Sequence, residues 1–216
     1  MSESAKIANI HYIYQDRPNK LKANKMAKRK LGRIGYELDE ANTNKDVLTA
    51  KRGNNIHINY TGTNINSPRD IISDVALATG AQRINPQFKE RRQKTRSIMR
   101  QYGDDTDYTM SGHSLGGSIA LNTLSQSKSI RDRTKVAHVF NPGYTKAFHE
   151  SIKPSDKKVK RQLNDKVNIH RVKGDLVSAH ANKETAFGNS FEYSHQDKNA
   201  DLSDKHSLDT FMEKDL

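Results

Sequence analysis

The sequence predicts an α/β domain with a mostly parallel central sheet flanked by helices. Short apolar stretches with the two-residue alternation of strands are separated by longer stretches with the periodicity of helices. A Gly-x-Ser-x-Gly motif lies at one of the strand-to-helix junctions. The chain of 216 residues is long enough for one hydrophobic core and short for two. Strands that alternate with helices favour parallel pairing, because each helix returns the chain to the same end of the sheet.

The first third of the chain combines a basic helix with three short strands. Residues 19–31 are predicted to form the helix, and Gly32 is predicted to end it. Residues 34–38 and 47–51 are short strand-like stretches on either side of a polar turn. Residues 56–60 alternate apolar side chains with histidine and asparagine, which is the pattern of a half-buried strand.

The rest of the chain continues the alternation of helices and strands. One helix is predicted to begin at Ser67 and another at Asn85, because both residues cap helices well and both are followed by proline, which suits the first helical position. The remaining predicted elements are strands over 108–111, 136–140 and 167–172, a helix over 115–124 and a final helix over 205–212.

The charge is uneven along the chain. Lys and Arg number 37 against 25 Asp and Glu, so the net charge is +12, and the excess lies in residues 1–33, 83–100 and 152–162. Such stretches attract polyanions, so peripheral contact with an anionic membrane surface is one hypothesis. Nucleic-acid binding is a weaker one, because no zinc-finger spacing or RNP pattern is present. The plain alternative is a set of solvated helix faces.

Three absences bear on the compartment in which the protein works. The chain has no cysteine, no apolar run near 18 residues and no secretory segment among its first residues. Together they predict a cytoplasmic or otherwise intracellular protein without disulfides.

The most informative stretch is Gly112-His113-Ser114-Leu115-Gly116, between a predicted strand and a predicted helix. A strand that turns at once into a helix holds its central serine in a strained conformation, and the flanking glycines avoid collisions of a Cβ with neighbouring backbone. The turn presents the Ser114 hydroxyl as a nucleophile. It also puts the Leu115 N–H at a helix N-terminus, where an oxyanion is stabilised. The alternative is an ordinary glycine turn with a solvent-exposed serine.

This stretch resembles the nucleophile elbow of the class 3, or fungal-type, lipases of the α/β-hydrolase superfamily. Two further segments support the resemblance. The strand at 56–60 with the following Thr61-Gly62-Thr63 is similar to a strand of that family that ends in Phe-Arg-Gly-Thr, with Tyr-Thr here in place of Phe-Arg. Residues 69–74 resemble a helix of the family, with Ile71 at the usual tryptophan position.

The resemblance covers about residues 34–212 in order. It implies an α/β-hydrolase fold of the small fungal-lipase type for residues 34–216 and leaves residues 1–33 as a basic N-terminal extension. It also implies a short lid over the site, at roughly residues 64–74, which contains no Trp or Phe.

The oxyanion hole is predicted to have two backbone donors. The resemblance implies that Thr63 supplies one N–H, and Gly62 before it leaves room for a ligand to approach the backbone. Leu115 supplies the other. An ordinary turn is the alternative interpretation of Gly62-Thr63.

The acid and base of a seryl hydrolase follow the serine in the order acid, then histidine. Asp175 is the best acid, because it comes directly after the predicted strand 167–172 and a Lys-Gly turn, at the same edge of the sheet as the elbow. His206 is the preferred base, because it lies beside a late hydrophobic helix as in the family. His195 and His180 remain alternatives, and His113 is predicted to be a packing residue that points away from the serine.

The sequence therefore predicts a carboxylic-ester hydrolase with the triad Ser114, Asp175 and His206 and the oxyanion donors Thr63 and Leu115. The resemblance implies a lipid ester, either an acylglycerol or a phospholipid, as substrate. This chemistry needs no cofactor and no metal. The alternative is a catalytically idle hydrolase scaffold that serves as a basic binding module for nucleic acid or an acidic partner.

Overall fold

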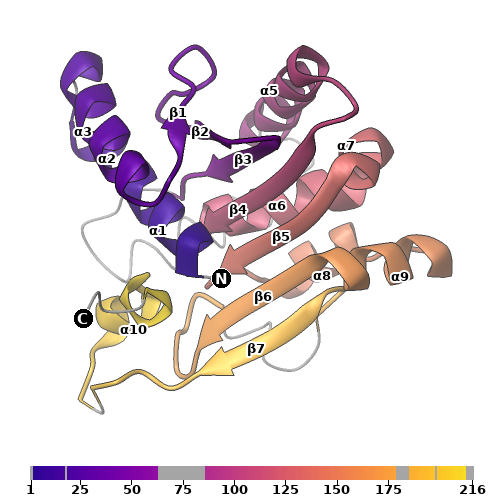
Figure 1. The fold of residues 1–216 in the computed structure, drawn as a ribbon. Coiled ribbons are helices and arrows are strands. Elements are labelled where there is room, and N and C mark those ends of the chain that lie inside the picture. Colours follow the sequence, from indigo (N-terminus) through magenta and orange to yellow (C-terminus); the bar gives the residue numbers. More distant parts are fainter. Residues whose placement is uncertain (1, 18, 63–85, 179–184, 198, 213–216) are drawn as a thin grey trace.

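The computed structural model of the chain describes residues 2–17, 19–62, 86–178, 185–197 and 199–212. Within these ranges one seven-stranded sheet is flanked by helices on both faces (Figure 1). The elements in chain order are α1 (Ser2–His11), α2 (Ile13–Asp16), α3 (Lys20–Arg33), β1 (Glu37–Leu38), β2 (Val47–Arg52), β3 (Asn55–Tyr60), α5 (Pro86–Tyr102), β4 (Asp107–His113), α6 (Leu115–Gln126), α7 (Lys128–Arg133), β5 (Thr134–Phe140), α8 (Lys146–Ile152), α9 (Lys157–Lys166), β6 (Val167–Val172), β7 (Asn189–Tyr193), α10 (Leu202–His206) and the 3₁₀ helix η2 (Asp209–Phe211).

The strands lie in the sheet in the order in which they occur in the chain, β1 to β7. Neighbouring strands from β3 to β7 pair in parallel, while β1 and β2 are antiparallel. The predicted mostly parallel sheet is therefore confirmed for five strands, and the sheet is antiparallel at its first edge. A two-strand hairpin forms there because only a short turn separates β2 from β3, too short for a crossover helix.

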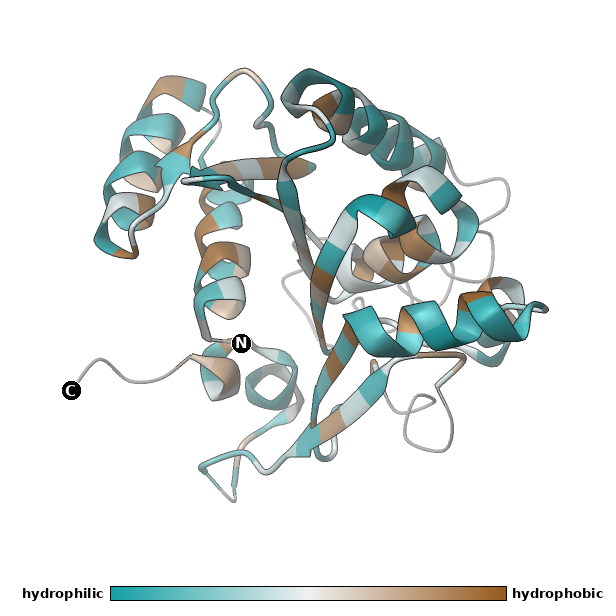
Figure 2. Ribbon diagram, turned by 45° about the vertical axis from the view of Figure 1, so that its right-hand side comes forward, coloured by the Kyte–Doolittle hydropathy of each residue, from teal (hydrophilic) through white to brown (hydrophobic). Residues whose placement is uncertain are grey.

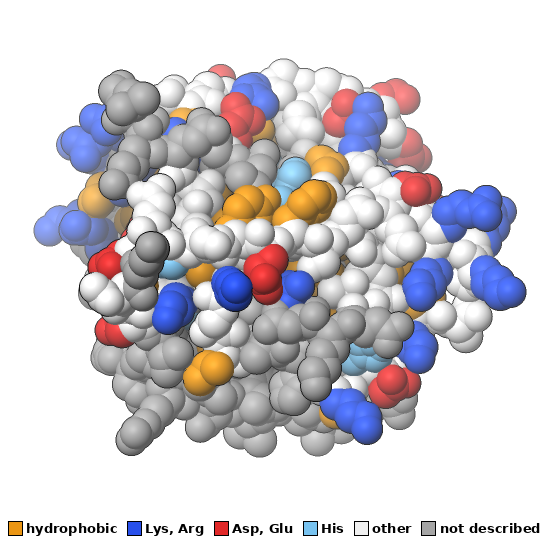
Figure 3. Space-filling model, turned by 90° about the horizontal axis from the view of Figure 1, so that it is seen from below, with side chains coloured by type: hydrophobic (Ala, Val, Ile, Leu, Met, Phe, Trp, Pro, Cys, Tyr) orange, Lys and Arg blue, Asp and Glu red, His pale blue; other side chains and the backbone are white. Residues whose placement is uncertain are grey.

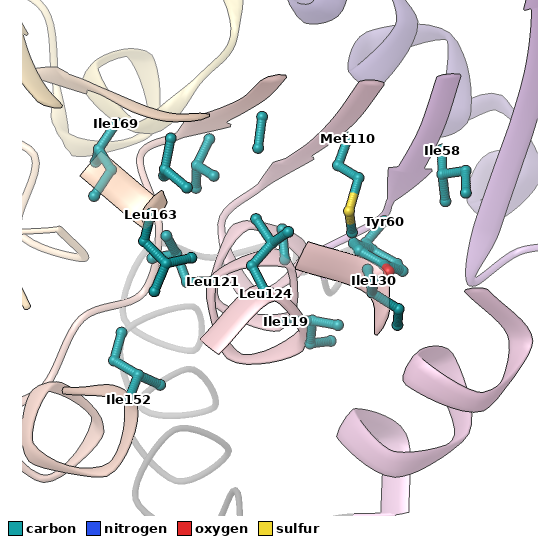
Figure 4. Close-up of a cluster of buried hydrophobic side chains, with 14 of the residues drawn as sticks. Ile58, Tyr60, Met110, Ile119, Leu121, Leu124, Ile130, Ile152, Leu163 and Ile169 are labelled. Atoms are coloured by element: carbon teal, nitrogen blue, oxygen red, sulfur yellow. The ribbon is translucent and has the colours of Figure 1, made fainter. Parts of the chain in front are cut away.

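The helices that connect parallel strands pack on one face of the sheet. Right-handed crossovers between successive neighbours all fall on the same side. The central strands present apolar residues to this face, for example Ile58, Met110 and Val139, and these pack against Ile119 and Leu163 of α6 and α9. Figure 4 shows this cluster, the main hydrophobic core.

The opposite face is covered by the N-terminal helices and the C-terminal segment. Ala5 and Ala8 of α1 share a cluster with Phe140 and with Phe211 of η2. A second cluster joins α1 and α3 to strand β2, among others through Leu48. Residues 1–33, expected as an extension, thus contribute helices that share buried clusters with the sheet, and in Figure 2 the apolar side of these helices faces inward.

This second face carries a row of polar side chains. Because strand residues alternate between faces, His57, Ser111, His138 and His170 all point toward the α1 side. Hydrogen bonds join His57 Nε2 to Ser111 Oγ at 2.7 Å and His138 Nδ1 to His170 Nε2 at 3.0 Å. Burial lowers the pKa of His57 and His170 to about 3 and that of His138 to about 4, so these histidines are neutral near pH 7.

The predicted elements agree with the structure in kind and differ at their ends. The basic helix α3 runs through Gly32 to Arg33, and the strand predicted over 108–111 is the longer β4. The late helix is two short pieces, with His206 as the last residue of α10. The helix predicted to begin at Ser67 lies outside the described residues. Strand β7 and helix α1 were not predicted; β7 is mostly exposed, so it lacks an apolar alternation.

The basic stretches differ in how their charges are used. On α5, Arg91 is buried and pairs with Asp46 at 3.0 Å, and three further cations are engaged with polar side chains: Arg92 with Asn122, Lys94 with Asn42 and Arg96 with Ser127. On α3 the cations lie on the exposed side, while Ala23, Ala27 and Leu31 face the core. Within the described ranges, no helix combines the length and the apolar character that a membrane span requires.

We expect the packing of α1 to be essential for stability. Ile7 is fully buried in the cluster between α1, α3 and β2. Ile7→Ala should lower the free energy of unfolding by about 2–5 kcal/mol, because a buried cavity replaces the three carbons that are removed. Leu21→Ala, on a side chain that is 79% exposed, is the matched control and should change it by less than about 0.5 kcal/mol. Urea unfolding measures both, and equal values would show α1 to be dispensable.

The neutral buried histidines predict acid lability. The unfolded chain binds protons near pH 6.5, whereas the native histidines bind them only near pH 3 to 4, so stability is full above pH 6.5 and falls as the pH falls. Each such histidine contributes about 1.4 kcal/mol per pH unit inside that window. The urea midpoint should therefore change little between pH 7.5 and 6.5 and drop steeply between pH 6.5 and 5.5. His138→Phe should flatten the slope, and a change at the exposed His195 should leave it as in the wild type.

Candidate active site

Ser114 occupies a strained turn between β4 and α6. Its backbone has φ 56° and ψ −127°, a conformation that L-residues rarely adopt. A Cβ on Gly112 would lie 2.4 Å from the Gly116 carbonyl oxygen, and one on Gly116 would lie 2.2 Å from the Tyr60 carbonyl oxygen. Both distances are far inside van der Waals contact, so only glycine fits at either position. The predicted strand–turn–helix geometry of the motif is confirmed.

Two backbone segments meet at this turn. The Leu115 N–H lies in the first turn of α6, where its hydrogen-bonding capacity is not used inside the helix. Gly62, at the end of the segment that follows β3, lies against the serine, because a Cβ on Gly62 would be 3.0 Å from Ser114 Cβ. Thr63 and the segment expected as a lid lie outside the described residues.

Asp175 lies at the carboxyl end of β6, beyond the turn at Lys173 and Gly174. It is buried and accepts hydrogen bonds from the N–H groups of Val177 and Ser178 and from the Ser178 hydroxyl, the last at 2.6 Å. Burial alone would raise the pKa of Asp175, but the hydrogen bonds from His206, Ser178 and Val177 outweigh it and hold the pKa below its usual value. The carboxylate is therefore charged at neutral pH.

His206 is the histidine that the structure brings to Asp175. Its Nδ1 lies 3.0 Å from Asp175 Oδ1, and its ring centroid lies 4.8 Å from that of His113, the neighbour of Ser114. The carboxylate binds a protonated Nδ1, so the Nε2 of the neutral ring is left to accept a proton. Nε2 is buried and has no hydrogen-bond partner among the described residues.

The structure describes one of the two alternative bases and not the other. His195 is exposed and its Nδ1 interacts with the backbone of Asp197, two residues away. His180 lies outside the described residues. The structure thus joins His206, and not His195, to the carboxylate of Asp175.

Asn141, which was not singled out from the sequence, links the segment of His206 to the end of β6. Its Nδ2 donates to the carbonyl oxygens of Lys205 and His206 at 3.0 and 3.2 Å, and its Oδ1 accepts from the Val172 N–H at 2.9 Å. Its backbone has φ 40°, which asparagine tolerates better than most residues. A buried asparagine just past a central strand, before Pro-Gly, is the sequence pattern that could have indicated this role.

The His113 side chain points to the α1 side of the sheet, away from the elbow, and packs there as predicted. It also makes two hydrogen bonds: its Nδ1 lies 2.7 Å from the Tyr12 hydroxyl, and its Nε2 lies 2.6 Å from the His206 carbonyl oxygen. The pKa of His113 is lowered to about 3, first by burial and then by the neighbouring His206.

The structure thus places Ser114 and Asp175 beyond the carboxyl ends of the parallel strands β4 and β6, and it brings the imidazole of His206 to Asp175. Among the described residues no group of three or more His, Asp or Glu side chains is placed to hold a metal ion. The chemistry that this arrangement allows is acceptance of a proton at His206 Nε2, which has no hydrogen-bond partner among the described residues.

Comparison with known proteins finds similarity in solved structures. No protein-family model and no curated protein sequence matches the chain. A lipase from Rhizopus microsporus var. chinensis aligns with 97% of this chain and 81% of its own, at a TM-score of 0.44 and 14% identity. The native Rhizomucor miehei lipase propeptide complex aligns with 77% of this chain at a TM-score of 0.42 and 17% identity, and this chain spans 61% of its length.

Proposed function

We propose that this protein is a serine carboxylic-ester hydrolase with an α/β-hydrolase fold of the fungal-lipase type. The observation that carries the proposal is the hydrogen bond between buried Asp175 and His206, at 3.0 Å. The His206 ring contacts that of His113, the residue directly before the strained turn of Ser114. A charged carboxylate that orients an imidazole beside such a serine is the arrangement that activates a hydroxyl nucleophile.

In the proposed reaction the Ser114 oxygen attacks the ester carbonyl while its proton moves to His206 Nε2. The tetrahedral oxyanion is bound by the backbone N–H groups of Leu115 and Thr63, and each such donor contributes about 3 kcal/mol of transition-state stabilisation. The imidazolium then gives its proton to the leaving alcohol. Water, deprotonated by the same imidazole, hydrolyses the acyl-enzyme and frees the carboxylic acid. Asp175 stabilises the imidazolium in both halves of the reaction.

We propose a lipid ester, an acylglycerol or a phospholipid, as the substrate. The resemblance of the elbow and of the Gly62-Thr63 segment to class 3 lipases supports this. A second support is Leu176, which directly follows Asp175 and is 51% exposed, so an apolar side chain faces solvent at the site.

An anionic lipid surface is the proposed docking partner of helix α3. Lys20, Lys22 and Lys25 are exposed there together with Leu21, so cations surround an exposed apolar side chain. The helix begins five residues after Gln15, whose Nε2 bonds the Gly62 carbonyl beside Ser114. α3 thus follows a segment that contacts the site, and the basic helix α9 lies on the other side of the molecule (Figure 1).

The binding-module alternative predicts a different outcome at the same serine. A scaffold without activity would leave Ser114 unreactive, whereas an activated serine reacts with a fluorophosphonate. The Asp175–His206 hydrogen bond favours the enzyme, because an idle scaffold has no need to hold a buried charge beside an imidazole.

We expect Ser114→Ala and His206→Ala each to lower kcat on a soluble short-chain ester by about 10⁴-fold or more, since an unassisted serine hydroxyl is a poor nucleophile. Hydrolysis of an ester series of rising acyl length, and of phospholipids, measures this. Ser129→Ala, an exposed serine on α7, and His195→Ala are matched controls that should keep wild-type rates. Fluorophosphonate should label the wild type and not Ser114→Ala. Full activity in the Ser114→Ala variant would refute the triad.

We expect the wild type to bind anionic vesicles more tightly than zwitterionic ones, and less tightly as salt is raised. The triple change Lys20→Glu, Lys22→Glu, Lys25→Glu should weaken binding by about a hundredfold, at about 1 kcal/mol per cation. The same charge change at the exposed Lys157, Lys158 and Lys160 of α9 is the control and should leave most of the binding. Co-sedimentation measures both. Equal losses of vesicle binding in the α3 and α9 variants would show that net charge, and not α3, causes the attraction. Tighter binding of the wild type to DNA than to vesicles would favour the binding module.

A further inference from the structure

A chain of hydrogen bonds runs from the N-terminal helices to the backbone of His206. Its members are the Tyr12 hydroxyl, the His113 ring and the His206 carbonyl, and the Tyr12 hydroxyl lies against the backbone of Gly62. Tyr12 lies between α1 and α2, in the part of the chain that falls outside the resemblance to lipases. The two ends of the hydrogen-bonded chain are the two sides of the proposed active site.

The donor and acceptor of each hydrogen bond in this chain follow from the one group that can only accept, the His206 carbonyl oxygen. A carbonyl oxygen only accepts, so His113 Nε2 must carry a hydrogen and donate to His206. The buried ring is neutral, since its pKa is lowered to about 3, and a neutral imidazole has one N–H. Nδ1 must therefore accept, and the Tyr12 hydroxyl must donate to it. The lone pairs of that hydroxyl are then free on the side where the Gly62 backbone approaches it.

Gly62 is held from its other side as well. Gln15 Nε2 donates to the Gly62 carbonyl oxygen at 2.6 Å, one helical turn from Tyr12. A Cβ on Gly62 would lie 3.0 Å from the Tyr12 hydroxyl and 2.8 Å from the His113 carbonyl oxygen, so the backbone approaches both closely. The Gly62 backbone is thereby held against Ser114, since a Cβ on Gly62 would also lie 3.0 Å from Ser114 Cβ.

We propose that Tyr12 and Gln15 are positioning residues of the active site, a proposal that rests on the proposed esterase function. The Tyr12 hydroxyl keeps His113 in the Nε2–H tautomer, and that N–H holds the His206 backbone. Without the hydroxyl, nothing sets the tautomer, and a ring protonated on Nδ1 would aim a lone pair at the His206 carbonyl, which repels it. Asn141 would then be the remaining donor to that carbonyl among the described residues.

The test is Tyr12→Phe, compared with Tyr14→Phe. The Tyr14 hydroxyl also makes a buried hydrogen bond, to Asn24 Oδ1 at 2.8 Å, but on the α3 side and away from the site. Both variants should lose similar thermal stability. Only Tyr12→Phe should lower kcat on a soluble short-chain ester, by about ten- to a hundredfold, because small displacements of catalytic groups are costly, while KM should stay within about twofold.

A spectroscopic measurement reports on the hydrogen-bond chain itself, independently of activity. Long-range ¹⁵N–¹H spectra distinguish a protonated ring nitrogen from a bare one, and the His113 signals are assigned by their loss in His113→Asn. Wild-type His113 should show a single tautomer, protonated on Nε2, between pH 5 and 8. Tyr12→Phe should show a mixture of tautomers, and Tyr14→Phe should look like the wild type.

The outcomes separate the two proposals. Two results would overturn the positioning role. The first is an active wild type together with equal kcat in Tyr12→Phe and Tyr14→Phe, and the second is a His113 tautomer that Tyr12→Phe leaves unchanged. A wild type that hydrolyses no ester and does not react with fluorophosphonate would overturn the esterase function, whatever the tautomer shows. If Tyr12→Phe does not fold, the kinetic test uses Gln15→Met. This variant should also lower kcat by about ten- to a hundredfold, and an unchanged kcat would overturn the positioning role.

Discussion

The close contact of backbone with backbone around Ser114 is the constraint on which the rest of the structure depends. Gly116 lies against the end of β3, Gly112 against the start of α6, and Gly62 against the serine itself. Three segments can approach this closely only where no side chain intervenes, so β3, β4 and α6 are locked in one arrangement. That packing sustains the positive φ of Ser114, because the energetic cost of one strained residue is smaller than the cost of losing the packing of three segments.

The order of the strands decides which parts of the chain complete the site. Since consecutive strands are neighbours, the connecting helices crowd one face and leave the other to α1, α3 and the C-terminal segment. The site lies where these two parts meet the ends of the strands (Figure 1). His206 comes from the C-terminal segment, and the contacts of Tyr12 and Gln15 come from the N-terminal helices.

The face under α1 shows how a lean composition can still form a packed interior. Only 33% of the residues are hydrophobic, and the largest apolar cluster lies on the crossover side of the sheet. The α1 side combines two smaller apolar clusters with hydrogen-bonded polar groups, such as Asn59 with His11 and with Ser111. Figure 3 shows the molecule from below, where apolar side chains and a histidine gather near the centre of the view and most Lys and Arg side chains lie around them.

The α/β class, the parallel strands around the elbow and the strained turn at Ser114 follow from local patterns in the sequence: alternation, caps and glycines at fixed offsets. The place of Asp175 also followed, since a residue just after a parallel strand lies at the same edge of the sheet as Ser114. That His206 and not His195 contacts Asp175 emerged only from the fold, as did the contacts of Tyr12, Gln15 and Asn141. Those contacts join residues up to 101 positions apart through single hydrogen bonds, as between Tyr12 and His113, and a bond of that kind leaves no periodic trace in the chain. The N-terminal helices were missed as part of the fold for a related reason: α1 is short and its buried apolar residues, such as Ile7 and Ile10, alternate with polar ones, so its apolar side is weak in the sequence and its partners lie on distant elements.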